Sequence, residues 1–246
     1  LLKDVANDIA CGARRVNGHL SAQGLSVLTA STAMATAIYW RINRIAVLPG
    51  FQRKGIATTL INRLLQQAKT EGVDALTTSY GATPSLTAFW NANDFKPAKP
   101  GLKRDASSGE YSLLMFLPLS QKMIDIQALI AQRFSQELLL HPAPETFGYQ
   151  PTILPFAVND SIRACTLTIL EQVINGSRSL QHARGSVAWL LETHSENIAP
   201  SESKVVLEDF VTNSNALNRL TERYRLSGKR ETERFIISHL GRVLTR

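Results

Sequence analysis

Hydrophobic positions in the first half of the chain change repeatedly between short continuous runs and helical spacing. Runs rich in branched and aromatic side chains predict three β-strands, over residues 36–48, 75–81 and 111–119. Helical spacing predicts two helices between them, over residues 55–71 and 83–93. This alternation of strand and helix is typical of an α/β domain.

The two predicted helices carry recognisable end signals. Thr83 and Pro84 suit the N-cap and the first turn of the shorter helix, and Gly72 suits the residue that follows the longer one. In the longer helix, apolar residues at steps of three and four predict one buried face, formed by Ile56, Leu60, Leu64, Leu65 and Ala68.

After residue 120 the pattern is helical only. Residues 121–140 have helical spacing, a proline-containing connector covers 141–151, and five further helices are predicted between residues 160 and 244. We therefore expect an α/β domain in residues 1–120, followed by an all-helical domain in residues 121–246.

Composition places the chain among ordinary globular proteins. Its 246 residues are 44% hydrophobic and 19% charged, and no apolar run approaches the roughly 18 residues of a membrane span. Acidic residues near the N-terminus argue against a signal peptide, so we expect a cytoplasmic protein. Neither the two cysteines nor the five histidines have the spacing of a metal site. The net charge of +7 favours a polyanionic partner.

The junction of the first predicted strand and helix has the sequence Gln52-Arg53-Lys54-Gly55-Ile56-Ala57, which fits the pattern Gln/Arg-x-x-Gly-x-Gly/Ala. A helix that begins here offers unpaired backbone N–H groups and the positive end of its dipole, which suit a phosphate. Gly55 allows the backbone to approach a ligand closely. The alternative is a turn that contains glycine by chance, because a six-residue pattern alone has limited specificity.

The flanking sequence "RIAVLPGFQRKGIATTLI" resembles the coenzyme A loop of the GNAT acetyltransferase family, and "FWNANDF" resembles that family's aromatic helix and the strand after it. The resemblance implies a GNAT-type mixed sheet with flanking helices. It also implies that the loop amides hold the coenzyme A pyrophosphate and that the pantetheine arm pairs with the central strand. The implied coenzyme-binding residues are Ile45, Ala46, Val47, Gln52, Arg53, Lys54, Gly55, Ile56, Ala57, Thr58, Ser85 and Ala92.

A narrower resemblance covers nearly the whole chain. "SYGATPSLTAFW", "KRDASSGEYSLLMFLPLS" and the helical remainder with "RLSGKRETERF" resemble the tRNA(Met) cytidine acetyltransferase family. This implies transfer of acetyl from acetyl-CoA to the N4 amine of the wobble cytidine of elongator tRNA(Met). That family carries an upstream helicase-like module that uses ATP and Mg²⁺. No G-x-x-x-x-G-K-[ST] sequence occurs here, and only about 44 residues precede the central strand, so we expect a C-terminal fragment or a truncated relative.

Four positions depart from the family pattern. Leu48 stands where the family tends to have a histidine that is a candidate general base. Ser85 and Ala92 stand at a family glutamate and arginine near the coenzyme, and Asp94 replaces a glycine. The missing base matters less for a cytosine amine, which is already neutral at pH 7, than for an alkyl ammonium. Tyr111 and Tyr80 are candidates to protonate the departing thiolate, although each is more often a packing residue.

Positive charge gathers in two regions that suit an RNA backbone. One cluster lies beside the expected acceptor cleft, where Arg14 and Arg15 extend it, and the other lies near the C-terminus. The predicted RNA-binding residues are Lys96, Lys99, Lys103, Arg104, Arg223, Arg225, Lys229, Arg230 and Arg234. The alternative for the second cluster is a solvated helical face.

Two other functions stay open from the sequence. One is a GNAT enzyme that acetylates a small-molecule or protein amine, for which an acidic acceptor cleft would be expected. The other is an RNA-binding remnant that has lost catalysis, which the residues at positions 48, 85 and 92 keep in consideration. The affinity for acetyl-CoA and an assay of modified tRNA nucleosides distinguish these functions.

Overall fold

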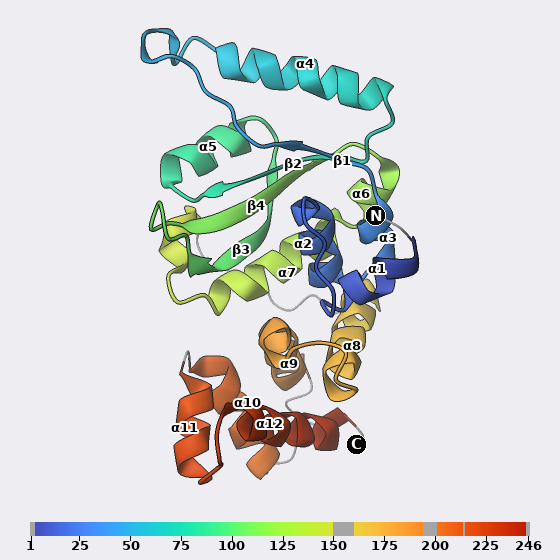
Figure 1. The fold of residues 1–246 in the computed structure, drawn as a ribbon, viewed down its shortest axis with the longest axis vertical. Coiled ribbons are helices and arrows are strands. Elements are labelled where there is room, and N and C mark those ends of the chain that lie inside the picture. Colours follow the sequence, from blue (N-terminus) through green and yellow to red (C-terminus); the bar gives the residue numbers. More distant parts are fainter. Residues whose placement is uncertain (1–2, 150–159, 194–200, 214, 245–246) are drawn as a thin grey trace.

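The computed structural model describes residues 3–149, 160–193, 201–213 and 215–244. A mixed four-stranded sheet with helices on both faces forms one half of the molecule, and a group of helices forms the other (Figure 1). The strands run in the order β1-β2-β4-β3, with β1 parallel to β2 and the other neighbours antiparallel. Their bounds are β1 Tyr39–Ile42, β2 Ala75–Gly81, β3 Lys96–Arg104 and β4 Tyr111–Pro118.

The helices around the sheet and those beyond it follow the order of the chain. Around the sheet lie α1 (Lys3–Ala10), α2 (Leu20–Thr29), α3 (Thr32–Thr36), α4 (Ile56–Thr70), α5 (Pro84–Ala92), α6 (Gln121–Asp125) and α7 (Gln127–Leu139). The helical half contains α8 (Asp160–Ile174), α9 (Arg184–Thr193), α10 (Glu202–Thr212), α11 (Ala216–Arg223) and α12 (Lys229–Leu244). None of the helices described is long and apolar enough to cross a membrane.

Most of the predicted elements are confirmed, including β2, β4, α5 with its Thr83 cap, and the helices after residue 160. The first strand was predicted too long. Residues 32–36 form α3 and the strand ends at Ile42, where its pairing with Thr78 of β2 is the last in the register. Beyond that point the segment 43–48 has no neighbouring strand, so its β-forming residues have no ladder to join.

One strand was absent from the prediction by hydrophobic pattern, and only the family resemblance implied a strand after the aromatic helix. β3 contains Pro97 and Pro100, which usually argue against a strand. It lies at the edge of the sheet and pairs with β4 alone, with register shifts at both prolines. An edge strand tolerates proline because on its open side no neighbouring strand needs a hydrogen bond from the N–H that proline lacks.

Helix α4 was predicted correctly in extent, and its buried face in part, since Ala68 is buried as predicted and Leu64 and Leu65 are half-buried. Ile61 and Ala68 are its buried residues, whereas Ile56 and Leu60 are 39% and 48% exposed. In Figure 1 the helix lies apart from the strands at one end of the molecule. The apolar stripe predicted from spacing therefore reaches only partly into the core.

The helix after residue 120 packs on the sheet. Phe134 and Leu138 of α7 lie in one core cluster with Leu113 and Phe95, and Ile130 lies with Phe116 on the opposite face. The apolar residues of α8 to α12 form a separate cluster around Trp189. We therefore propose that the α/β unit extends through residue 149, rather than ending at residue 120.

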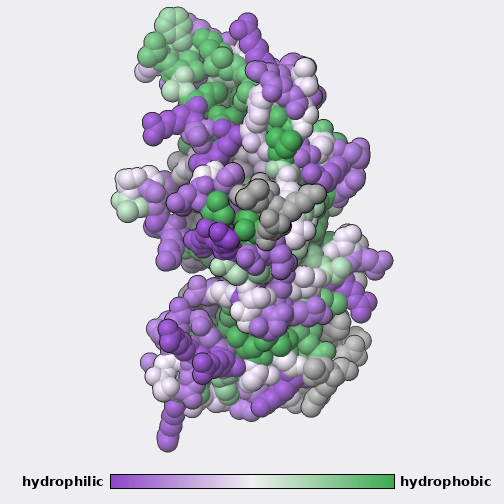
Figure 2. All heavy atoms as spheres, turned by 45° about the vertical axis from the view of Figure 1, so that its right-hand side comes forward, coloured by the Kyte–Doolittle hydropathy of each residue, from purple (hydrophilic) through white to green (hydrophobic). Residues whose placement is uncertain are grey.

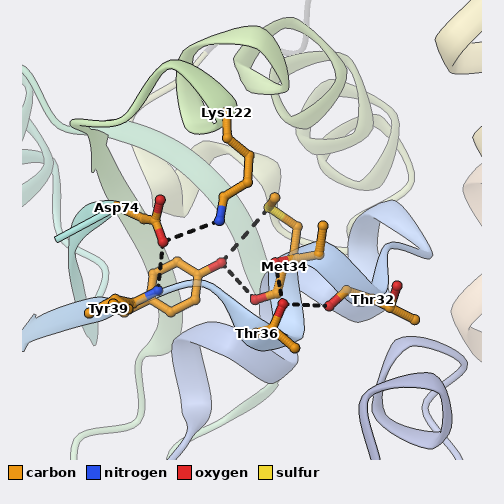
Figure 3. Close-up of polar contacts among 8 residues, drawn as sticks. Thr32, Met34, Thr36, Tyr39, Asp74 and Lys122 are labelled. Carbon is orange, nitrogen blue, oxygen red and sulfur yellow. Dashed lines mark hydrogen bonds and ion pairs between the residues drawn. The ribbon is translucent and has the colours of Figure 1, made fainter. Parts of the chain in front are cut away.

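Asp74 connects the starts and ends of three elements beside α3 (Figure 3). Its carboxylate accepts a hydrogen bond from the backbone N–H of Ile38 at 2.8 Å and pairs with the ammonium of Lys122 on α6 at 3.2 Å. Its backbone carbonyl accepts from Leu119 and Ser120, just after β4. Burial would raise the pKa of Asp74, but the bonds from Ile38 and Lys122 outweigh it and lower the pKa.

Replacement of Asp74 by alanine is expected to lower the free energy of unfolding by about 2 kcal/mol at neutral pH, because it removes the acceptor for Ile38 and Lys122. A carboxyl with a lowered folded-state pKa stabilises the protein above its unfolded pKa. The difference between parent and variant should therefore shrink as the pH falls below about 4. Urea unfolding at several pH values measures it, with Asp8→Ala at an exposed position as control. A difference that is independent of pH would contradict the role of the charge.

Candidate active site

The loop before α4 is held by its own backbone and by one side-chain bond. A short 3₁₀ turn covers Pro49–Phe51, and the amide of Gln52 donates from Nε2 to the carbonyl of Val47 at 2.9 Å. Arg53 and Gly55 both have positive φ, at 62° and 77°. These left-handed residues reverse the chain, so that α4 begins directly after Gly55.

The start of α4 presents unpaired donors. Thr59 is the first residue whose N–H bonds to a helical carbonyl, that of Gly55 at 2.9 Å. The N–H groups of Ile56, Ala57 and Thr58 therefore have no partner within the helix, as geometry requires at an N-terminus. Gly55 is the N-cap and supplies no side chain to satisfy them. Three adjacent N–H groups at the positive end of a helix dipole suit an anionic oxygen.

A hollow of about 480 Å³ opens over this helix start. Ten of the twelve residues predicted to hold a coenzyme line it, from segments 45–47, 52–58 and Ser85. Lys54 and Ala92 are not among the described lining residues. The ammonium of Lys54 instead lies 5.3 Å from the centre of the Phe51 ring.

Four lining residues were missed by the sequence reasoning, namely Phe51, Leu86, Phe89 and Trp90. Trp90 packs at an angle against Phe95, with ring centres 4.8 Å apart. The spacing of "FWNANDF" placed these rings on one helix, but nothing in it said which rings face a ligand. Leu48 and Phe51 are 72% and 55% exposed, and Figure 2 shows hydrophobic atoms gathered at this end of the molecule.

The segment Ile45 to Val47 was predicted to lie in a strand, and it does not. Pairing between β1 and β2 ends at Ile42 and Thr78, and from there segment 43–48 and the rest of β2 diverge. We call this point of divergence the fork. The backbone of this segment is thus outside the sheet ladder while its residues line the hollow. An extended ligand could pair with it there.

The two candidate tyrosines lie on the same face of the sheet as α5. Tyr80 stacks with Trp90 at 6.1 Å, and its hydroxyl bonds to Thr87 and Met115. Burial raises the pKa of Tyr80 to about 12. Tyr111 lies against His141, with the guanidinium of Arg104 over its ring. Neither tyrosine is among the described residues that line the hollow, so a catalytic role for either stays a prediction.

The positions that depart from the family pattern have distinct surroundings. Leu48 points to solvent, and Ser85 lines the hollow, where its hydroxyl lies 3.3 Å from that of Thr83. Asp94 has a φ of 64°, a left-handed conformation that glycine adopts more easily. Asp94 thus has a backbone conformation that a glycine at this position would adopt with less strain.

The predicted RNA-binding residues fall into two separate regions. Lys99 and Lys103 line a second hollow beside β3, Lys96 is exposed, and Arg104 donates to the carbonyl of Gly109. The five tail cations are all exposed on and between α11 and α12, at the opposite end of the molecule from α4 (Figure 1). Of these, Lys229 pairs with Glu233 at 3.9 Å, and Arg223 lies over the ring of Tyr224.

Comparison with known proteins places the first hollow within a matched family domain. The acetyltransferase (GNAT) family matches residues 17–90, a range that contains every described residue lining the first hollow. The chain is 31% identical over 243 residues to the tRNA(Met) cytidine acetyltransferase TmcA of Vibrio cholerae, which covers 96% of this chain and 33% of that protein. The protein of the same name from Haemophilus ducreyi is 30% identical over 79% of this chain and 33% of its own length.

A third relative, the tRNA(Met) cytidine acetyltransferase TmcA of Salmonella typhimurium, is 39% identical over 120 residues, or 49% of this chain and 18% of that protein. The chain spans about a third of the length of the first two relatives. Both the mixed sheet with its flanking helices and the helical region that follows agree with these matches. The chain therefore belongs to the GNAT acetyltransferase family, and within that family it belongs with the tRNA(Met) cytidine acetyltransferases.

Proposed function

We propose that the chain transfers an acetyl group from acetyl-CoA to the N4 amine of a cytidine in tRNA, namely the wobble cytidine of elongator tRNA(Met). The thioester supplies the activated acetyl group. In the reaction the amine nitrogen bonds to the acetyl carbon, the carbon–sulfur bond breaks, and the amine loses a proton as the thiolate gains one. We place any ATP- and Mg²⁺-dependent step outside these 246 residues, which contain no G-x-x-x-x-G-K-[ST] sequence.

One observation carries the proposal. Residues predicted to hold a coenzyme from three separate segments line one hollow at the N-terminus of α4. The unpaired N–H groups of Ile56 to Thr58 suit the pyrophosphate, and the diverging segment 45–47 suits the amide-bearing pantetheine arm. The apolar rim around Phe51 suits the remaining surface of a coenzyme.

The residue at position 48 favours a nitrogen acceptor that is neutral before the reaction. Leu48 is exposed and cannot remove a proton, whereas an alkyl ammonium must lose one before it attacks. A cytosine amine needs no such step. This supports cytidine over a small-molecule or protein amine as the acceptor, and it fits the names of the relatives, which are tRNA(Met) cytidine acetyltransferases.

Location and RNA contact belong to the same proposal. Cys11 and Cys165 are free and buried, which suits a reducing compartment such as the cytoplasm. We assign the exposed cations Arg225, Arg230 and Arg234 to the RNA backbone, since none of the three forms an ion pair among the described residues.

The test is acetylation of a tRNA(Met) transcript with isotope-labelled acetyl-CoA, followed by mass spectrometry of the released nucleosides. We expect labelled N4-acetylcytidine from the transcript and none from a matched transcript with uridine at the wobble position. Binding of acetyl-CoA without any labelled cytidine would contradict the acetylation and favour an RNA-binding remnant. Label in a protein or small amine instead would favour the other acceptor class.

A further inference from the structure

Two hollows on the other face of the sheet form one continuous groove. They measure about 340 and 550 Å³ and share Arg15, Leu20, Gly24, Lys99 and His182. The walls come from the loop between α1 and α2, from β3, and from a 3₁₀ turn at Leu180–Ala183 that belongs to the helical half. The groove thus requires both halves of the molecule.

The groove has cations on its facing walls. Arg14 and Arg15 come from the loop, and Lys99 and Lys103 come from β3. None of the described residues that line either hollow is acidic, and none of these four cations forms an ion pair within the described part of the chain. Four unpaired cations along a groove this long suit an extended polyanion better than a single phosphate.

His182 adds a second, independent sign of a ligand. It lines both hollows, and its Nδ1 atom is buried without a hydrogen-bond partner among the described residues. Burial, together with the charges of Lys99, Arg178 and Arg15, lowers the pKa of His182 to about 4. A neutral imidazole beside unpaired cations can bond to a polar ligand without adding to their mutual repulsion.

The groove ends at the fork beside the first hollow. Its floor includes Ser79, one residue past Thr78, the last residue of β2 that pairs with β1. Thr77, on the same face as Ser79, bonds to Ser21 of α2 at 2.7 Å, whereas Tyr80 faces Trp90 of α5. The groove, which α2 borders, and the coenzyme hollow, which α5 borders, therefore lie on opposite faces of the sheet. Figure 1 shows where α2 and α5 lie relative to the strands.

We propose that this groove holds the sugar–phosphate backbone of the acceptor RNA and delivers the target base to the fork, with Arg14, Arg15, Lys99 and Lys103 contacting phosphates and His182 donating or accepting a bond at its Nδ1. The inference rests on the proposed function, which supplies RNA as the acceptor. No phenylalanine, tyrosine or tryptophan is among the described lining residues, so we expect recognition of the backbone here rather than base stacking.

The test compares charge reversals in binding of a fluorescein-labelled anticodon stem–loop RNA. Arg15→Glu/Lys99→Glu should weaken binding by at least about 25-fold at 0.1 M salt, since each single-strand phosphate contact contributes roughly 5-fold there, and should reduce the salt slope by about 1.4. The matched control is Arg63→Glu/Lys69→Glu, an identical charge change at exposed positions of α4. Arg14→Glu/Arg15→Glu, confined to the exposed loop, repeats the test if Lys99 proves necessary for folding.

A second readout reports from inside the groove. Phosphates beside Lys99 and Arg15 would offset the charges that lower the pKa of His182, so that pKa, followed by imidazole NMR, should rise when the RNA is added. RNA bound only to the tail would leave it unchanged.

The outcomes separate the inference from the proposed function. Equal losses of RNA affinity in the groove variant and the α4 control would contradict RNA binding in the groove, and so would an unchanged pKa of His182 while RNA binds. Neither result would contradict RNA acetylation. A parent chain that binds acetyl-CoA but no RNA would overturn both. Unchanged acetyl-CoA affinity in the groove variant, together with the predicted loss of RNA affinity, would support the groove.

Discussion

Replacement of Gly55 by glutamate is expected to reduce the affinity for acetyl-CoA by at least about 100-fold. A Cβ at this residue would meet no atom within 4 Å, so the new side chain enters open space at the helix start. A carboxylate placed about 4 Å from a phosphate oxygen near the surface costs about 3 to 4 kcal/mol, which corresponds to that loss of affinity. Isothermal titration calorimetry of parent and variant measures it directly.

Two controls separate charge from backbone effects. Gly50→Glu adds the same charge to the same loop, at a residue that also has open space around it but does not line the hollow. It should bind acetyl-CoA within a few-fold of the parent. Gly55→Ala adds no charge but places a Cβ at a φ of 77°, which costs about 1 kcal/mol in the loop. It should lose less affinity than the glutamate variant.

The result bears directly on the coenzyme loop. Equal affinity of the parent and Gly55→Glu would place acetyl-CoA somewhere other than the hollow over α4. A folded parent with no affinity for acetyl-CoA would indicate that the loop is only a glycine-containing turn. Loss of acetyl-CoA affinity in the glutamate variant alone would indicate that the coenzyme phosphates bind at the backbone amides of Ile56 to Thr58.

Local signals in the sequence were sufficient for the two helices that border the coenzyme hollow. Thr83 and Pro84 mark the start of α5 because capping is decided within one turn. The start of α4 at Gly55 was predictable for the same reason, since a positive φ and an unpaired helix end are local properties. Ten of the twelve residues that the family resemblance implied for coenzyme binding line one hollow, and their role stays a prediction.

Features that depend on distant neighbours were not predictable in this way. β3 tolerates Pro97 and Pro100 only because it has a single neighbour in the sheet. Ile56 and Leu60 have the spacing of a buried face but lie where α4 stands away from the sheet. The groove joins three segments far apart in sequence, so His182 gave no signal beforehand although the basic residues facing it did.

The contact between the two halves includes buried side chains that bond to carbonyls at the ends of α1 and α2. Arg178, which follows α8, donates to the carbonyl of Val27 in the last turn of α2 at 2.9 Å and to that of Ala10, the last residue of α1, at 2.7 Å. Cys165 of α8 likewise reaches the carbonyl of Thr29, and Arg133 of α7, within the sheet half, reaches that of Leu28. Carbonyls in a last helical turn have no helical partner, and a cation also complements the negative end of the dipole.

Replacement of Arg178 by methionine is therefore expected to lower the free energy of unfolding by about 3 kcal/mol. The variant keeps most of the volume but leaves the acceptors of Ala10, Val27 and Gln172 without their donor, and bonds to a charged group are worth about 1.5 to 3 kcal/mol each before desolvation is subtracted. Burial and the nearby charge of Arg133 lower the pKa of Arg178 to about 10, so the guanidinium stays charged at neutral pH. Urea unfolding gives the loss.

The sign of this effect decides between two opposing contributions. Desolvation of a buried cation can exceed what its bonds return, and in that case an apolar replacement is neutral or stabilising. Here the hydrogen bonds of Arg178 should exceed its desolvation cost, because one planar guanidinium satisfies three acceptors at once, including carbonyls at the ends of two helices. The stability of Arg178→Lys, which keeps the charge but loses the planar guanidinium, should lie between those of the parent and the methionine variant. Arg163→Met, at an exposed position, should change the free energy of unfolding by less than about 0.5 kcal/mol. A methionine variant as stable as the parent would show that the cation is tolerated there for a reason other than stability. The RNA affinity of that variant would then be the quantity to measure, since the charge of Arg178 also lowers the pKa of His182 in the groove.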